Sequence, residues 1–245
     1  MTVVYDRLAG YRLYPKTMEK QVGKLNIKRK IIGFAIISFV ILCITLFLPA
    51  RTLNYWEAWV YIGIIFSCAS GVIAYFLKHD PQLLERRLKT REKLREQKLI
   101  IRFVWLLYMP TFLIPGFDRY YGWSDVPLIL IIFSDILVLT GYLIVIAVFR
   151  ENSYTSRVVD VESGQKVIST GPYAIVRHPM YSGNILMYCF TPVALGSYWG
   201  LIGSVLIFLL VILRIKSEEK FLLENLNGYR EYLKRTRYRL IPGIW

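Results

Sequence analysis

Uncharged apolar runs alternate with charged segments along this chain. Most of the runs are about long enough to cross the hydrocarbon layer of a bilayer as a helix. A helix is suited to that place because it satisfies its own backbone hydrogen bonds. The pattern predicts an all-α, polytopic membrane helical bundle of about five to six transmembrane helices. The runs are Ile31–Ala50, about Ala58–Leu77, Leu99–Gly116, Val126–Phe149, Met180 to about Leu195, and about Trp199–Leu213.

Three features interrupt these runs. Pro110 and Pro115 break the third run, which we expect to be kinked or shallow. Gly196-Ser197-Tyr198 separates the last two runs into a hairpin. Asp135 lies inside the fourth run, and an acid at that depth rarely faces lipid. We expect a neutral Asp135 that forms a hydrogen bond between helices, with a buried functional carboxylate as the alternative.

The polar segments divide the chain into two regions. Lys78–Lys98 is dense in charge, with leucines at near-helical spacing. This predicts an amphipathic helix on the membrane surface, or equally a solvated linker helix. Residues 150–176 form a polar stretch that suits a folded loop. We therefore expect a region 1–149, with membrane helices and the linker at about 78–98, and a region 150–245, with the C-terminal hairpin and a charged tail.

The composition agrees with an integral membrane protein. The 245 residues are 55% hydrophobic, which is high for a soluble domain of this length. The net charge of +14 is compatible with nucleic acid, but the basic residues gather beside apolar runs and no nucleic-acid-binding motif is present. Membrane topology and anionic lipid headgroups explain the charge better. We expect membrane lipids as partners and no nucleic acid.

The distribution of Lys and Arg predicts the orientation. These residues are abundant before Ile31, in the linker, around residues 150–177 and after Arg214, and sparse in the other connections. The pattern indicates an even number of crossings, about six, with both termini cytoplasmic. Residues 1–30 lack the short apolar core of a removable signal peptide. Neither a metal site nor a disulfide is expected at the three cysteines, which lie in apolar runs without ligand spacing: Cys43, Cys68 and Cys189.

The segment Arg177–Gly183, RHPMYSG, stands where the polar stretch meets an apolar run. Pro179 disfavours helical angles at His178 and suits the first position of a helix. An imidazole beside the free amides of a helix start favours an anionic group such as a carboxylate. Tyr181 adds an aromatic face, and Gly183 permits a close approach. The alternative is a histidine that only caps or packs.

A second charged cluster, Arg214–Glu219, closes the last apolar run. Arg214 and Glu218 are four residues apart and share a helical face, which predicts a simple ion pair worth under about 1 kcal/mol or a functional site. In a functional site, Arg214 would hold a carboxylate, and Glu218 and Glu219 would take the ammonium or hydroxyls of a cofactor. The predicted topology places both clusters on the cytoplasmic face.

The run GQKVISTGPYAIVRHPMYSG, followed by Arg214, Glu218-Glu219 and GYREYLKRTRYRLIPG, resembles the C-terminal catalytic region of the isoprenylcysteine carboxyl methyltransferase family. That family is related to membrane phospholipid methyltransferases. Its members are helical membrane enzymes that bind S-adenosylmethionine in a cytosol-facing pocket and admit a lipid substrate laterally. The resemblance implies the following cofactor-binding residues: Gln165, Lys166, Val167, Ile168, Tyr173, His178, Pro179, Met180, Tyr181, Glu218 and Glu219.

The resemblance also implies roles for the basic residues. Arg214 matches the arginine that holds the methyl acceptor's carboxylate, and Arg177 and Glu218 join it as catalytic candidates. Arg235 and Arg239 fall in basic, substrate-binding positions. A carboxylate is already ionised at neutral pH and needs no base, whereas an amine acceptor would need proton removal by a glutamate.

We therefore predict a multi-pass membrane methyltransferase that uses S-adenosylmethionine, with its active site on the cytoplasmic side. Its substrate would be a lipid or prenylated small molecule that enters from the membrane, with a carboxylate favoured, and no metal is expected. The alternatives are a phospholipid amine N-methyltransferase, an NADPH-dependent membrane reductase of the steroid type, and a non-enzymatic membrane protein. No GxGxxG fingerprint is present, so a Rossmann methyltransferase domain is not expected.

Overall fold

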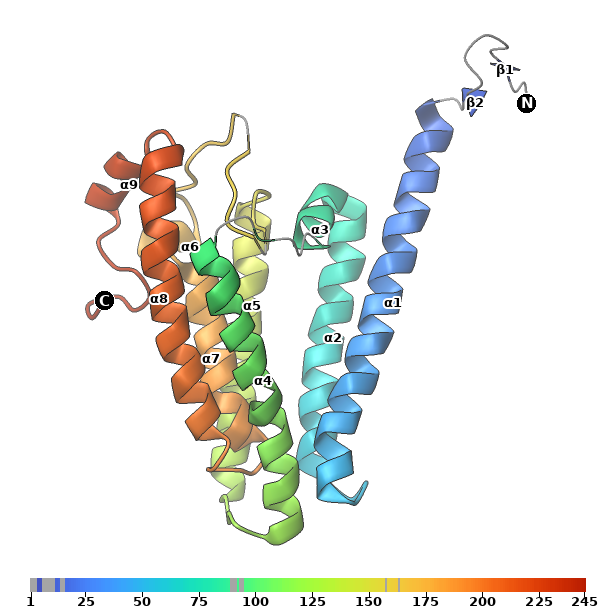
Figure 1. The fold of residues 1–245 in the computed structure, drawn as a ribbon, viewed down its shortest axis with the longest axis vertical. Helices are drawn as coiled ribbons and strands as arrows, with labels where there is room; N and C mark the ends of the chain where they lie inside the picture. Colours follow the sequence, from blue (N-terminus) through green and yellow to red (C-terminus); the bar gives the residue numbers. More distant parts are fainter. Residues whose placement is uncertain are drawn as a thin grey trace. The chain divides into compact units, whose positions relative to one another are not determined.

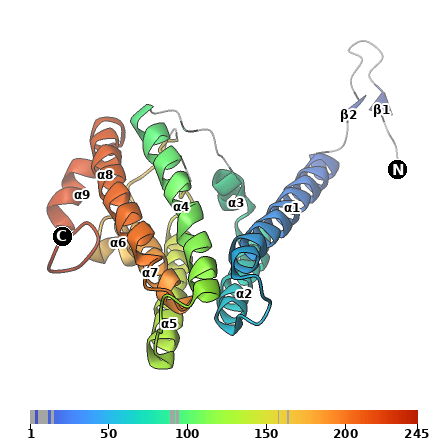
Figure 2. The same cartoon turned by 60° about the horizontal axis from the view of Figure 1, so that its bottom comes forward.

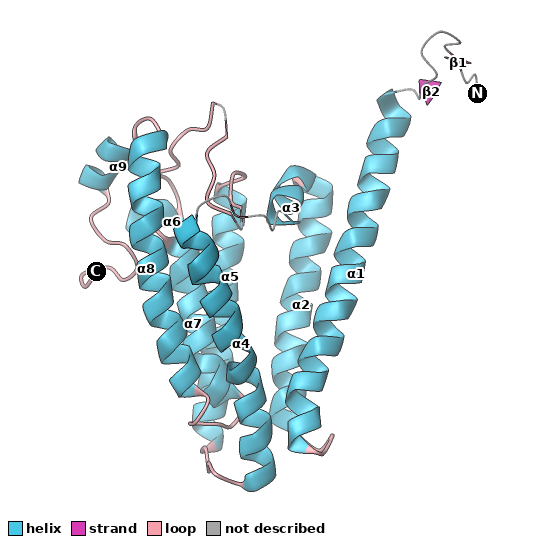
Figure 3. Ribbon diagram, in the orientation of Figure 1, coloured by secondary structure: helices cyan, strands magenta, loops and turns pink. Residues whose placement is uncertain are grey.

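The fold is given by a computed structural model, and it is dominated by helices (Figure 3). The structure describes residues 4–5, 12–13, 16–88, 92, 95–156, 158–162 and 164–245, with side chains described from residue 28 onward except at Trp105. The chain forms two compact units, residues 1–41 and residues 42–245. All of the residues in the candidate site belong to the second unit.

The first unit contains two short strands and the beginning of the first helix. Strands β1 (Val4–Tyr5) and β2 (Arg12–Leu13) are antiparallel, with Val4 opposite Leu13. Helix α1 (Lys16–Ala50) starts in this unit and continues into the second. The predicted apolar run Ile31–Ala50 is the C-terminal part of this helix.

The second unit holds the remaining helices (Figure 1). Three long helices correspond to the predicted runs. The second and third runs are extended at both ends, whereas the helix of the fourth run begins at Leu128, after the predicted Val126, and ends at Glu151. α4 continues as a helix through Pro110 and Pro115. The helices are α2 (Trp56–His79), α3 (Pro81–Leu88), α4 (Arg95–Tyr121), α5 (Leu128–Glu151), α6 (Pro172–Ile175), α7 (Pro179–Ala194), α8 (Leu201–Asn225) and α9 (Tyr229–Arg235).

The prediction of an all-α membrane bundle is confirmed. Among the described residues, four helices are long and apolar enough to cross a membrane: Lys28–Ala50, α2, α4 and α5. The predicted C-terminal hairpin is formed by α7 and α8, which pack against each other and against α5 and α4. α7 is only 16 residues long, and α8 carries charges from Arg214 onward. Its apolar part is therefore short.

The charged segment Lys78–Lys98 differs from the single amphipathic helix that the leucine spacing predicted. α2 continues to His79, α3 covers Pro81–Leu88, and α4 already begins at Arg95. Asp80 explains the break, because its carboxylate accepts a hydrogen bond from the Leu83 amide at 3.1 Å and Pro81 occupies the first helical position. Leu83 and Leu84 are buried, so the inner face of α3 packs on protein.

Helices α5 and α7 make the most extensive contact in the second unit, and they lie side by side in both views (Figures 1 and 2). Gly141 of α5 faces Gly183 of α7 at their closest approach. A Cβ on Gly141 would lie 2.5 Å from the Gly183 carbonyl oxygen, and a Cβ on Gly183 would lie 2.6 Å from the Gly141 carbonyl oxygen. The glycine of the RHPMYSG segment therefore permits close contact between two helix backbones.

Replacing Gly141 by alanine is expected to destabilise the protein by about 1–3 kcal/mol, because the added methyl must force two backbones apart. Gly63→Ala in α2 is the matched control, since a Cβ there meets no atom within 4 Å. Thermal unfolding in detergent measures both variants. Equal melting temperatures for Gly141→Ala and Gly63→Ala would show that the helices separate without cost.

A buried polar network joins the connections at the end of the second unit opposite α3. Asp118 of α4 accepts hydrogen bonds from the Ser124 amide at 2.7 Å, from the Ser124 hydroxyl at 2.6 Å and from the Ser197 hydroxyl at 2.5 Å. The Tyr55 hydroxyl donates to the Leu195 carbonyl at 2.5 Å. These contacts tie the α1–α2, α4–α5 and α7–α8 connections to their neighbouring helices at one end.

Asp135 lies in α5 and is 8% exposed. Its Oδ1 atom is buried and has no hydrogen-bond partner in the part of the chain that the structure describes. The hydrogen bond between helices that we expected of the Asp135 side chain is thus not seen at Oδ1, and it stays a prediction for the side chain as a whole. The expectation rested on the high free-energy cost of an unpaired polar group at membrane depth. This cost predicts that a partner exists, but it does not identify the partner.

Candidate active site

The RHPMYSG segment folds as its sequence predicts. His178 has non-helical backbone angles, with φ −125° and ψ 59°, and Pro179 is the first residue of α7. The segment is also paired with the C-terminal tail: the Arg177 amide donates to the Tyr238 carbonyl, and the His178 amide donates to the Arg239 carbonyl, both at 2.9 Å. The tail therefore fixes the entrance to α7.

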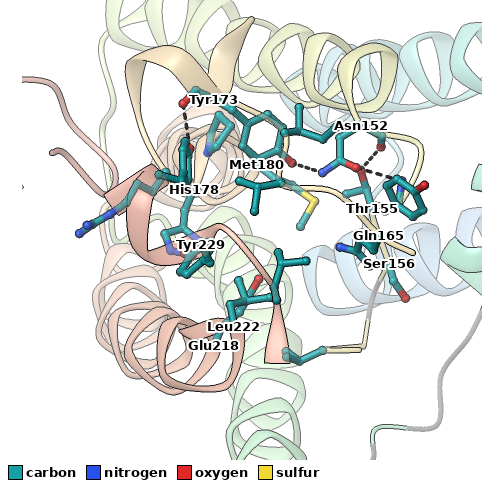
Figure 4. A pocket seen from close by; sticks show the side chains of 18 of the residues that line it. Asn152, Thr155, Ser156, Gln165, Tyr173, His178, Met180, Glu218, Leu222 and Tyr229 are labelled. Carbon is teal, nitrogen blue, oxygen red and sulfur yellow. Dashed lines mark hydrogen bonds between the residues drawn. The ribbon is translucent and has the colours of Figure 1, made fainter. Parts of the chain in front are cut away.

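A pocket lies between the loop after α5, the start of α7, and helices α8 and α9 (Figure 4). It is lined by the four consecutive residues 165–168, by Tyr173 and by residues 177–181 of the RHPMYSG segment. Glu218 lines it from α8. The structure thus brings all of the predicted cofactor-binding residues except Glu219 to one cavity, together with Arg177.

The sequence motif did not predict the other residues that line the pocket. They come from the loop after α5, from the end of α8 and the residue that follows it, and from α9. Leu222 lies four residues after Glu218 in α8, so the helical repeat could have identified it. Nothing in the sequence marked the loop. These additional lining residues are Asn152, Tyr154, Thr155, Ser156, Val158, Val159, Asp160, Leu222, Leu226, Tyr229 and Tyr232.

Glu219 lies at the centre of a buried ionic cluster. Its Oε1 atom is 2.9 Å from Arg177 Nε and 3.3 Å from His178 Nε2, and its Oε2 atom accepts a hydrogen bond from Arg239 Nε at 2.8 Å. Burial alone would raise the pKa of Glu219. The hydrogen bonds from His178 and Arg239 and the charge of Arg177 outweigh burial, so the pKa is lowered. Glu219 is therefore held in its charged form.

This position differs from the predicted role of Glu219 in cofactor binding. Neighbouring residues of a helix point about 100° apart, so Glu218 and Glu219 cannot face the same cavity equally. Glu218 lines the pocket, whereas Glu219 lies outside its lining and joins the RHPMYSG segment to the tail. Its contacts support a role in holding Arg177 and His178.

Tyr181 bridges Arg214 and Glu218. Arg214 Nε donates a hydrogen bond to the Tyr181 hydroxyl at 2.6 Å, and that hydroxyl donates to Glu218 Oε2 at 2.6 Å. The predicted direct pair between Arg214 and Glu218 is thus a chain of three groups from α7 and α8. Arg214 is connected to the pocket through Tyr181, because Tyr181 and Glu218 line the cavity and Arg214 does not.

The two tail arginines occupy different places. Arg239 contacts Glu219, and its guanidinium lies 5.1 Å from the centre of the Trp245 ring. Arg235 is exposed at the end of α9 and does not line the pocket. The structure therefore connects Arg239 to the candidate site through Glu219 and leaves Arg235 outside the cavity.

The pocket combines aromatic, apolar and acidic surfaces. Burial raises the pKa of Tyr173 to about 12, so its hydroxyl stays protonated and accepts a hydrogen bond from Asn152 Nδ2 at 2.9 Å. The Tyr229 hydroxyl is buried without a hydrogen-bond partner among the described residues. Glu218 supplies a carboxylate at the wall. Such a set suits a ligand with a flat ring, hydroxyls and a positive charge.

The four helices of the described residues that are long and apolar enough to cross a membrane define the class of protein, an integral membrane protein. Residues 129–228 match the family model of the phospholipid methyltransferases, a family of integral membrane methyltransferases. The match confirms the predicted resemblance and supports a methyltransferase. No curated protein matches this sequence.

Proposed function

We propose that this protein transfers a methyl group from S-adenosylmethionine to a lipid-like acceptor at the membrane surface. The observation that carries the proposal is the convergence of residues 165–168, the RHPMYSG segment and Glu218 on one pocket. Glu218 is far along the chain from the other two segments, and the family match covers all three. The catalytic region would be residues 150–245, together with the end of α5.

The pocket residues fit this cofactor. Glu218 carries a negative charge suited to an ammonium or to ribose hydroxyls, and the described residues offer the buried Tyr229 hydroxyl no hydrogen-bond partner. Tyr173, Tyr229 and Tyr232 supply aromatic faces, and Val167, Ile168 and Leu222 are apolar. S-adenosylmethionine would supply an electrophilic methyl group, which is transferred by in-line displacement from a sulfonium.

The residues of the chain would orient the acceptor. Arg214 is a candidate for holding an acceptor carboxylate, because a guanidinium can bind both of its oxygens. Tyr181 fixes Arg214 Nε at 2.6 Å and links it to the pocket. A carboxylate acceptor would then react without a base, and orientation would supply the main rate advantage.

An amine acceptor is the second candidate, and the description of the matching family as phospholipid methyltransferases favours it. An amine must lose a proton, and Glu218 is a carboxylate on the pocket wall that could accept it. Mass spectrometry of membranes incubated with isotopically labelled methyl donor distinguishes the two acceptors, because it identifies the species that gains mass.

The orientation belongs to the same proposal. The linker, the RHPMYSG segment and the tail would lie on the cytoplasmic side, where Lys and Arg accumulate. The connection that contains Arg51 would then face the other side. Labelling of cysteines introduced at Lys78 and Leu53, which are both exposed, tests this orientation in intact cells.

Calorimetry tests cofactor binding. Wild-type protein is expected to bind S-adenosylhomocysteine, and Glu218→Gln is expected to bind it about 10- to 100-fold more weakly because a hydrogen-bonding charge is lost. Glu224→Gln is the matched control, since Glu224 is exposed on the same helix and does not line the pocket. Stabilisation of the wild type by NADPH but not by S-adenosylhomocysteine would favour a reductase. Binding of neither ligand would favour a non-enzymatic protein.

A further inference from the structure

We propose that Arg86, Arg87 and Glu92, in the charged linker between α2 and α4, are positioning residues for the methyl donor. They contact the pocket wall formed by residues 152–162 and hold it in the shape that the donor requires. The proposal rests on the proposed function and assigns a role to a segment that lies outside the family match at residues 129–228.

Arg86 makes the strongest of these contacts. Its Nε and Nη2 atoms donate to the two carboxylate oxygens of Glu162, at 3.0 and 2.9 Å. Its Nη1 atom donates to the Ser153 carbonyl at 2.9 Å. A two-fold arginine–carboxylate contact fixes direction as well as distance. One side chain of α3 therefore joins two points of the wall.

Arg87 and Glu92 contact the wall between these two points. Arg87 Nη1 donates to the Ser156 carbonyl at 3.1 Å and lies 3.7 Å from the sulfur of Met180, a pocket residue. Glu92 is 5% exposed, and its Oε2 atom accepts a hydrogen bond from the Val159 amide at 3.1 Å. The linker thus donates hydrogen bonds to backbone carbonyls of the wall and accepts one from a backbone amide.

The wall needs such support because none of its described residues lies in a helix or a strand. α5 ends at Glu151 and α6 begins at Pro172, and loops of this length are uncommon unless they are functional. Glu162 also connects the linker to the pocket lining, since its amide donates to Gln165 Oε1 at 3.0 Å. Arg86 is thus connected through Glu162 to Gln165, which lines the pocket.

The role is positioning, because Arg86, Arg87 and Glu92 do not themselves line the pocket. Loss of Arg86 should therefore weaken binding of the methyl donor and leave the acceptor untouched. A residue that only stabilised the fold would change the melting temperature without separating the two substrates.

The test is a charge exchange in the full-length protein. Arg86→Glu and Glu162→Arg are each expected to weaken S-adenosylhomocysteine binding about tenfold, and the double variant is expected to recover most of the loss. The KM for the acceptor and the kcat at saturating donor should change by less than about twofold. Hydrogen exchange of residues 152–162 in ligand-free protein should rise in both single variants and return in the double variant.

Lys78→Glu is the matched control, because Lys78 is an exposed cation at the end of α2 that does not contact the wall. Equal weakening by Lys78→Glu and Arg86→Glu would assign the effect to net charge and overturn the proposal. Normal binding and exchange in Arg86→Glu would also overturn it, while leaving the proposed function intact. A folded wild type that binds no S-adenosylhomocysteine would overturn both.

Discussion

Arg214→Ala is expected to lower methyl transfer by at least about 100-fold, because the variant removes the guanidinium that would orient the acceptor. Arg214 Nε contacts the Tyr181 hydroxyl at 2.6 Å, and Tyr181 in turn contacts Glu218. The variant should retain S-adenosylhomocysteine binding, since Arg214 does not line the pocket. Transfer is measured with labelled donor, and binding by calorimetry.

Two further variants separate charge from geometry at Arg214. Arg214→Lys keeps the charge but not the planar fork, and it should recover only a small part of the rate. Lys220→Ala is the matched control, because Lys220 is an exposed cation on the same helix. A rate close to wild type in Arg214→Ala would refute the role of this residue in orienting the acceptor.

Glu219→Ala is expected to destabilise the protein by about 3–5 kcal/mol, because removing one member of a buried charge cluster leaves its partners uncompensated. The side chains of Arg177 and His178 are only 9% and 5% exposed, so water cannot replace the lost carboxylate. Glu224→Ala, an exposed change on the same helix, should stay within about 0.5 kcal/mol of wild type. Denaturant unfolding in detergent compares the two, and equal midpoints would contradict the expectation.

Because of the same cluster, the stability of the folded protein should decrease at acid pH. Because the folded protein lowers the pKa of Glu219, the carboxylate contributes its full stability above its unfolded value of about 4.3. That contribution is lost as the pH falls through the lower folded value. As the pH falls from neutral into that acid range, the free energy of unfolding should therefore decrease more in the wild type than in Glu219→Gln, which has no carboxylate at this position. Parallel acid unfolding profiles for the two proteins would refute this.

The sequence was sufficient for features that depend on local chemistry. Uncharged apolar runs predicted α2 and α5, because a membrane-spanning helix needs length and apolarity. Pro179 predicted the start of α7, since a proline restricts the residue before it. The resemblance predicted residues 165–168 as part of one site with Glu218, and the structure places them around one cavity.

The sequence was not sufficient for features that depend on distant partners. Periodicity assigns a residue to a helix face, but it does not identify the opposing side chain. Arg86 and Glu162 are 76 residues apart, and nothing in either segment specifies the other. The bridging position of Tyr181 and the inward direction of Glu219 likewise depend on how α7, α8 and the tail pack. These are the features that only three-dimensional structure reveals.

The close contact of Gly141 and Gly183 has a consequence for the dimensions of the cavity. Gly183 belongs to the RHPMYSG segment but lies outside the pocket lining, as does Gly141. The end of α5 leads directly to Asn152 on one wall, and the start of α7 carries His178 on another. We therefore expect the close approach of these two helices to influence the spacing of the two walls. A bulkier residue at either glycine is expected to shift these walls, and ligand selectivity would then change although every residue that lines the cavity stays the same.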